Sequence, residues 1–147
     1  MTNSSPDQFL GFMLGSAYRG VSNQFARILK PYDITPEQWS VLFTIAGHEG
    51  INQKEVAAVV HKDQPTTARI IDLLLKKNYV TKLTCSNDRR AFVLYVTQEG
   101  KELIDRTVPL ERENEKAALA GFLPEQVQNL REMLELIHHN TGNIHQE

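Results

Sequence analysis

Three consecutive charged residues, Asp88, Arg89 and Arg90, form the part of the sequence whose types and spacing best suggest chemistry. A carboxylate two residues from a guanidinium can orient it through a charge-assisted hydrogen bond, and narrow minor grooves of DNA attract arginine. The alternative is an exposed ion pair at the tip of a hairpin, which contributes little to stability. These three residues alone therefore leave a DNA contact and a solvated hairpin tip both open.

A second set of candidates lies on a predicted helix over residues 64–77. Its apolar stripe consists of Thr67, Ile70, Ile71 and Leu74, and Pro65 and Arg69 lie on the opposite face. Gln64, Thr66 and Arg69 carry donors that suit base edges and phosphates. The other interpretation of these residues is an ordinary solvated helix face.

The charge of the chain is distributed unevenly. The net charge is −2 over 147 residues, with a pI of about 6.2. Residues 52–97 hold eight Lys and Arg against four Asp and Glu, whereas residues 98–147 hold five against ten. A basic middle beside acidic flanks is the pattern expected of a local electrostatic footprint, although chance unevenness on solvated faces produces it too.

Local signals place helices on both sides of the basic segment. Apolar residues at steps of three and four predict a first helix over 6–30, which Pro31 ends. Thr35, Asn52 and Asp63 each precede a helical pattern and predict the N-caps of three further helices. Beyond residue 97, Thr97 caps a helix over 98–120 that Pro109 should kink or divide, and Pro124 opens a last helix.

The helical spacing of apolar residues gives way to a strand-like composition after the helix that Asp63 caps and before Thr97. Residues 79–84 and 91–97 are rich in Val, Thr, Leu, Phe and Tyr, with the polar stretch 86–90 between them. This pattern predicts a β-hairpin with a charged tip. Three capped helices followed by a basic hairpin predict a mostly α fold with a small β wing, a winged helix-turn-helix, whose helix over 64–77 fits the major groove.

The sequence resembles the MarR family of bacterial transcription regulators. Asp88-Arg89-Arg90 followed by Val96-Thr97 matches the family's wing signature, with Val96 in place of the usual Leu. The segments over 34–39, 74–80 and 97–101 match its other motifs. The resemblance implies that Arg90 enters the minor groove, held by Asp88, and that Arg89 contacts phosphate. The family often has Thr where this chain has Ala68, and Gly where it has Asn78.

The resemblance also implies a division of labour along the chain. Residues 35–97 would form the DNA-binding domain, and residues 1–34 and 98–147 a helical dimerisation layer. A homodimer would then face a pseudo-palindromic operator in double-stranded DNA. The family implies repression relieved by a small aromatic or phenolic effector, often an anion, bound between the two layers.

Other classes of function are weaker. The chain lacks a Gly-rich phosphate loop, a nucleophile with a supporting motif and paired carboxylates, so we expect no enzyme and no cofactor. The five histidines have no spacing typical of a metal site, and Cys85 is expected to be structural. Trp39 and Phe43 are expected to be core aromatics first and pocket-lining residues second. No apolar run could span a membrane and no leader pattern begins the chain, which favours a cytoplasmic protein.

The alternative to a DNA-binding regulator is a winged-helix adaptor that binds protein instead of DNA, which would explain the acidic pI.

Overall fold

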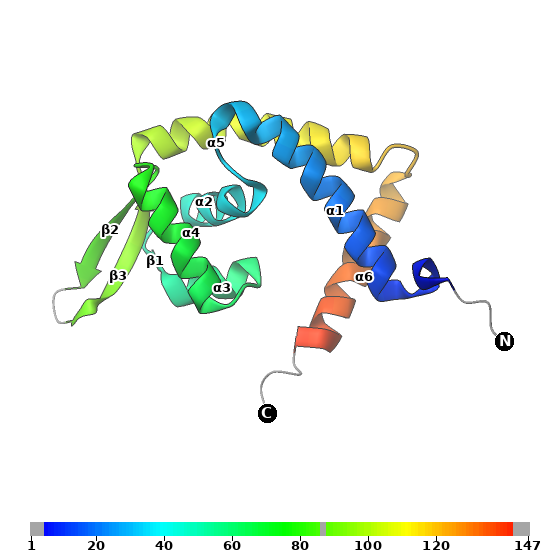
Figure 1. Ribbon diagram of the computed structural model, residues 1–147, viewed down its shortest axis with the longest axis horizontal. Coiled ribbons are helices and arrows are strands. Elements are labelled where there is room, and N and C mark those ends of the chain that lie inside the picture. Colours follow the sequence, from blue (N-terminus) through cyan, green and yellow to red (C-terminus); the bar gives the residue numbers. More distant parts are fainter. Residues whose placement is uncertain (1–4, 86–87, 143–147) are drawn as a thin grey trace. The chain divides into compact units, whose positions relative to one another are not determined.

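The computed structural model describes residues 5–85 and 88–142, and describes side chains over 5–85 and 91–142. The chain divides into two compact units, residues 1–114 and 115–147. Its elements, drawn in Figure 1, are the short 3-10 turns η1 (Pro6–Gln8) and η2 (Lys30–Tyr32), the helices α1 (Leu10–Leu29), α2 (Pro36–Gly47), α3 (Gln53–Val60), α4 (Gln64–Lys76), α5 (Gln98–Ala118) and α6 (Pro124–Gly142), and the strands β1 (Ile51–Asn52), β2 (Val80–Cys85) and β3 (Asp88–Val96).

Capping side chains fix the start of each helix around the basic segment. Thr35 and Asn52 each form a capping box, with Gln38 and Glu55 as the reciprocal partners. Asp63 accepts a hydrogen bond from the backbone nitrogen of Thr66 and so caps α4. Each box satisfies backbone donors that a helix leaves unpaired at its N-terminus. All three caps predicted from the sequence are confirmed.

The transition from α4 to the wing is equally local. Asn78 adopts the left-handed conformation, with φ of 62°, where the helix ends. Asparagine tolerates this conformation better than most residues. The backbone nitrogen of Tyr79 then donates to Leu74 O, and the chain enters β2 directly. The predicted end of the helix is therefore confirmed.

The wing is a small antiparallel sheet in the order β1-β3-β2. β2 pairs with β3 from Val80↔Val96 to Cys85↔Asp88, with an irregularity between Thr84 and Cys85. β1 adds a short third strand through the pair Ile51↔Leu94. The sequence predicted the hairpin and not β1. Two residues are too short to carry a period, and their pairing is non-local.

The start of β3 and the continuity of α5 differ from the prediction. The stretch 86–90 was expected to lie between the strands, but β3 already begins at Asp88. The polar residues of this stretch suggested a turn, and the backbone pairing of Cys85 with Asp88 that extends the strand is not visible in residue type. Pro109 does not divide α5, which is one helix over Gln98–Ala118. Proline removes one donor, to the carbonyl of Asp105, and both residues are exposed, so water can bind that carbonyl.

The hydrophobic core of the first unit joins α1, α2, α4, the sheet and the first half of α5. Its fully buried side chains include Leu29, Leu42, Ile45, Leu74 and Leu94. Trp39 is 9% exposed and donates from Nε1 to Thr107 Oγ1 at 2.8 Å, which ties α2 to α5. The DNA-binding candidates of α4 are thus anchored on a rigid core.

Both units leave apolar side chains exposed. In α1, Leu10, Phe12 and Met13 are each more than half exposed, and in α6 the same holds for Met133 and Leu136. No residue of α6 is buried. None of the described helices is long and apolar enough to cross a membrane.

Candidate nucleic-acid interface

The exposed face of α4 carries the side chains that the sequence singled out. Thr67, Ile70, Ile71 and Leu74 are buried on the opposite face, as predicted, and Thr67 is completely buried. Gln64, Pro65 and Arg69 are exposed, and Thr66 is half-buried. This face therefore offers the amide of Gln64 and the guanidinium of Arg69 to a ligand.

Thr66 is more constrained than the sequence suggested. Its hydroxyl donates to Asp63 Oδ2 at 2.8 Å and accepts a long hydrogen bond from Arg69 Nη2 at 3.5 Å. The pKa of Asp63 is lowered, chiefly because the backbone N–H and then the hydroxyl of Thr66 donate to the carboxylate. The hydroxyl proton of Thr66 is committed within the protein, so Thr66 can offer a ligand only an acceptor.

The three charged residues of the wing lie at the start of β3. The backbones of Asp88, Arg89 and Arg90 continue the ladder with β2, while their side chains lie outside what the structure describes. The expected contact between Asp88 and Arg90 is thus neither supported nor opposed by the geometry. What the backbone supplies is a place for them at the far end of an exposed hairpin (Figure 1).

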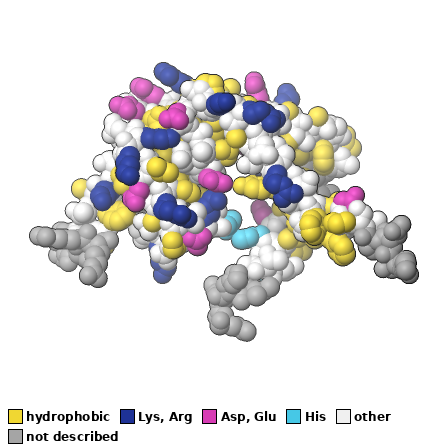
Figure 2. Space-filling view, in the orientation of Figure 1, with side chains coloured by type: hydrophobic (Ala, Val, Ile, Leu, Met, Phe, Trp, Pro, Cys, Tyr) yellow, Lys and Arg dark blue, Asp and Glu magenta, His cyan; other side chains and the backbone are white. Residues whose placement is uncertain are grey.

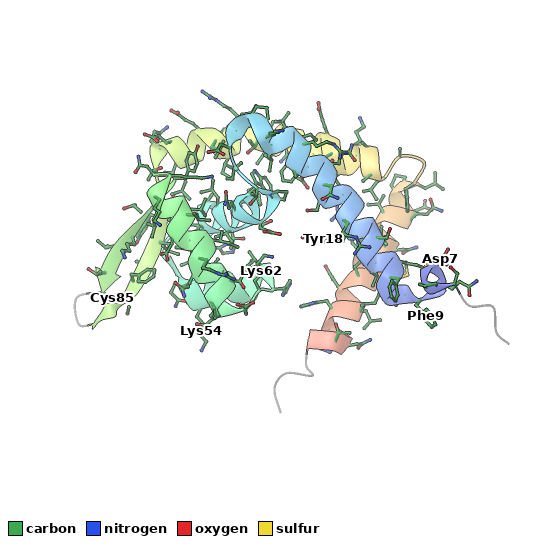
Figure 3. The ribbon with its side chains drawn as sticks, in the orientation of Figure 1. Asp7, Phe9, Tyr18, Lys54, Lys62 and Cys85 are labelled. Carbon is green, nitrogen blue, oxygen red and sulfur yellow. The ribbon has the colours of Figure 1, made fainter. Side chains whose placement is uncertain are left out.

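A groove of about 360 Å³ joins α4 to the wing. Gln64 lines it at the start of α4, Lys54 near the start of α3, and Cys85 at the end of β2. Asn52, Gln53 and the β3 segment 91–93 complete its wall. Figure 3 labels Lys54 and Cys85 on these elements, and Figure 2 shows Lys and Arg side chains over α3 and α4 with acidic ones among them.

Two lysines of this region escaped the sequence analysis. Lys54 is exposed beside the groove, and Lys82 Nζ on β2 lies 5.2 Å from the centre of the Phe92 ring. The ring holds the ammonium on the wing through a cation–π contact. The basic excess of residues 52–97 contained both lysines, but nothing in their spacing placed them near α4.

Cys85 is exposed and therefore does not pack in the core, while its expected structural, non-redox role stays a prediction. Cys85 lies at the irregular end of β2. Val80, at the opposite end, is the buried residue of this strand. Among the described residues no group of His, Cys, Asp and Glu could hold a metal ion.

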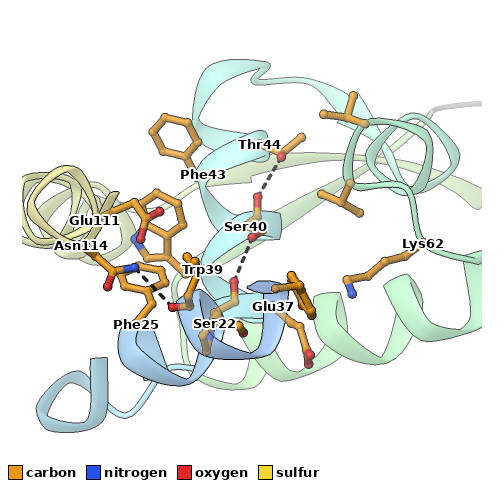
Figure 4. A pocket seen from close by; sticks show the side chains of 15 residues that line it. Ser22, Phe25, Glu37, Trp39, Ser40, Phe43, Thr44, Lys62, Glu111 and Asn114 are labelled. Atoms are coloured by element: carbon orange, nitrogen blue, oxygen red, sulfur yellow. Dashed lines mark hydrogen bonds between the residues drawn. The ribbon is translucent and has the colours of Figure 1, made fainter. Parts of the chain in front are cut away.

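A second cavity, of about 440 Å³, lies among α1, α2, the end of α3 and α5 (Figure 4). Trp39 and Phe43 form one wall, with stacked rings 5.0 Å apart. Phe43 is 47% exposed, so its first assignment, to the core, is wrong and its second, to the wall of a pocket, is confirmed; Trp39 is buried as expected. Phe43 follows Trp39 by four residues and shares its helix face, but that face runs past the edge of the core and into the cavity.

Comparison with known proteins confirms the resemblance seen in the sequence. Residues 34–92 match the model of the MarR family. A MarR transcriptional regulator from Methanosarcina mazei Go1 is 26% identical, with a TM-score of 0.82, and the match covers 93% of this chain and 99% of that chain.

Two further structures share the fold at lower identity. Mutant MarR from E. coli, complexed with operator DNA, is 21% identical with a TM-score of 0.81, over 91% of this chain and 99% of that one. BpsR of Bordetella bronchiseptica, whose DNA binding is regulated by 6-hydroxynicotinic acid, is 20% identical with a TM-score of 0.81, over 87% and 97%.

Proposed function

Since the chain has the winged helix-turn-helix of MarR-family regulators and matches the family model over residues 34–92, we propose that it is a sequence-specific transcription regulator of double-stranded DNA. The exposed face of α4 enters the major groove, and Gln64, Pro65, Thr66 and Arg69 form the readout surface. Asp88, Arg89 and Arg90 bring the wing to the adjacent minor groove and phosphates.

The observation that carries this proposal is the groove that α4 and the wing share. Gln64 lines the same groove as the β3 segment 91–93, so the first turn of α4 and the wing face one ligand together. Lys54 adds a positive charge at its edge. A helix start beside a basic hairpin suits a duplex, whose major groove accepts a helix while its phosphates attract cations.

We propose further that the protein acts as a homodimer, with residues 1–34 and 98–147 as the dimerisation layer. The support is the exposed apolar residues of α1 and α6, which a second copy would cover. A 19-residue helix without a buried residue gains little stability from packing within its own chain. A two-fold dimer presents two copies of α4 to two half-sites.

The regulator is proposed to repress, and a small aromatic or phenolic effector is proposed to relieve repression. The cavity of about 440 Å³ beside Trp39 and Phe43 has the size of a small-ligand site. Its wall includes Val59, Val60 and Lys62 at the end of α3, the helix that leads into α4. A ligand bound there can therefore bias the position of the reading helix.

Selection of bound sequences from random duplexes tests the proposal. Wild-type protein should enrich a pseudo-palindrome with half-site centres about 10 bp apart. Arg69→Ala combined with Arg90→Ala should enrich it poorly, while Arg106→Ala, an exposed arginine of α5, should behave like wild type. Repeating the selection with phenolic compounds tests effector relief. A final pool indistinguishable from the starting pool would support the protein-binding adaptor.

A further inference from the structure

Several hydrogen-bond donors that line the cavity beside Trp39 and Phe43 are already committed within the chain. Ser40 Oγ donates to Pro36 O at 2.9 Å, and Thr44 Oγ1 donates to Ser40 O at 2.8 Å, both drawn in Figure 4. Trp39 Nε1 is bound to Thr107 Oγ1. A hydroxyl has one proton and two lone pairs, so Ser40 and Thr44 can offer a ligand only acceptors.

The amide of Asn114 has one of its two N–H donors committed and its oxygen free. Its Nδ2 donates to Val21 O at 3.4 Å, which joins α5 to α1. Its Oδ1 is buried without a hydrogen-bond partner in the part of the chain that the structure describes, and the residue is only 2% exposed. A buried acceptor without a donor is destabilising, and a ligand or a water that donates to it can relieve this cost.

The charges that line the cavity also favour a ligand that donates hydrogen bonds. Glu37 and Glu111 contribute two carboxylates, and Lys62 contributes the one ammonium. Of the other polar residues, the hydroxyls of Tyr18 and Ser22 and the amide of Asn114 can serve as either donor or acceptor. The wall therefore carries a net negative charge and an excess of acceptors, which disfavours an anionic ligand.

The aromatic side of the cavity suits a ring and a cation. Phe43 stacks on Trp39 with an interplanar angle of 7°, and Phe25 meets Trp39 edge-on at 5.2 Å. Because Phe43 is half exposed, one face of this aromatic cluster remains available. The negative faces of aromatic rings attract cations as well as other rings.

We propose that this cavity binds an aromatic cation, a ring bearing a protonated amine, in preference to an aromatic carboxylate. The ring packs against Phe43, and the ammonium donates to acceptors among Glu111, Ser40 and Thr44. The proposal that this ligand acts as an effector rests on the proposed regulatory function. The proposal that the cavity binds it does not.

Fluorescence titration tests the binding directly, because Trp39 is the sole tryptophan and lies in the cavity wall. The probes are phenethylammonium, the neutral phenethyl alcohol and the similarly sized anion 3-phenylpropionate, at neutral pH and without DNA. We expect phenethylammonium to bind about tenfold or more tightly than 3-phenylpropionate, with the alcohol between them; tenfold corresponds to about 1.4 kcal/mol.

Two variants of opposite sign separate charge from shape. Glu111→Gln should weaken phenethylammonium severalfold and leave the alcohol unchanged, whereas Lys62→Gln should strengthen phenethylammonium and weaken the anion. Glu113→Gln, an exposed carboxylate of α5 outside the cavity, is the matched control and should change nothing. Circular dichroism of each variant reports whether it folds.

Tighter binding of 3-phenylpropionate, no binding of any probe, or loss of all binding in Lys62→Gln would overturn the proposal. Failure of the regulatory function looks different. Phenethylammonium would still bind with the expected preference, but DNA would not be bound, or its binding would not respond to the ligand.

Discussion

Asp63 accepts two hydrogen bonds from Thr66 at the start of α4. Its carboxylate caps the helix by accepting from the backbone of Thr66, and it also accepts the hydroxyl proton of the same residue. The hydroxyl in turn accepts from Arg69, so cap and reading side chain form one relay. An exposed arginine restrained in this way loses less side-chain entropy when it binds, and its contact is better defined.

This relay predicts different losses for two residues of α4. Arg69→Ala should relax sequence preference at one position in each half-site and cost about 1–3 kcal/mol of binding. Thr66→Val, which keeps the shape and removes the hydroxyl, should weaken the same preference less. Thr66→Ser restores the hydroxyl and should recover it. The measurement is affinity for operator variants substituted one base pair at a time.

A structural role for Thr66 alone gives another pattern. In that case Thr66→Val would lower the melting temperature and reduce affinity equally for every operator variant, with the base preference unchanged.

Arg90 on the wing should behave differently from Arg69. A minor-groove contact responds to groove width and charge, so Arg90→Ala should weaken binding by about 1–3 kcal/mol evenly across operator variants and lower the salt slope by about one phosphate equivalent. Asp88→Ala should act in the same direction but less strongly. Folding should be unaffected, because a hairpin tip contributes little core.

Wild-type affinity and salt dependence in Arg90→Ala would contradict this role. The wing would then be structural, and DNA binding would depend on α4 alone. Arg106→Ala controls for a general loss of positive charge.

At the scale of elements, the close approach of α5 to the wing depends on Gly100. A Cβ there would overlap the carbonyl oxygen of Tyr79 and lie 2.6 Å from Val96 Cγ1. Thr97 immediately precedes α5 and caps it. Its Oγ1 accepts a hydrogen bond from the backbone nitrogen of Gly100 and donates one to Asn78 O. The end of α4, the base of the wing and the start of α5 therefore converge on this residue.

Gly100→Ala should destabilise the protein by about 1–3 kcal/mol, the usual cost of overpacking. Gly47→Ala is the matched control, since nothing lies within 4 Å of its Cβ position and its φ is not positive. Chemical denaturation of both variants measures the difference. Equal stability of the two would show that the backbone at Tyr79 yields easily.

The elements that could be predicted from the sequence are those fixed by neighbours in the chain. The caps at Thr35, Asn52 and Asp63 depend on residues three positions away, and the left-handed Asn78 on its own side chain. Strand β1 and the exposure of Phe43 depend on residues distant in sequence, so no local pattern reveals them. The same holds for the candidate site. Arg69 could be predicted from its position on the helix face. The place of Lys54 beside the groove and the committed hydrogen-bond donors of the cavity could be identified only from the folded structure.

For the whole molecule, the apolar residues that each unit leaves exposed predict a homodimer. Sedimentation at micromolar concentration should give a homodimer. Leu134→Glu, on the apolar stripe of α6, should shift it toward monomer or aggregate, while Glu135→Gln on the same helix should not. A well-folded wild-type monomer would contradict the proposed dimerisation layer.

This acidic protein is proposed to bind duplex DNA through the surface around α4 and the wing. The most direct test of this proposal is the affinity for a selected duplex measured across salt concentrations. Neutralising several phosphates releases counterions, so log affinity should fall linearly with log salt, with a slope of about −0.9 per phosphate contact and several contacts in total. A flat dependence, or no binding at low salt, would contradict the account and favour a winged-helix adaptor that binds protein.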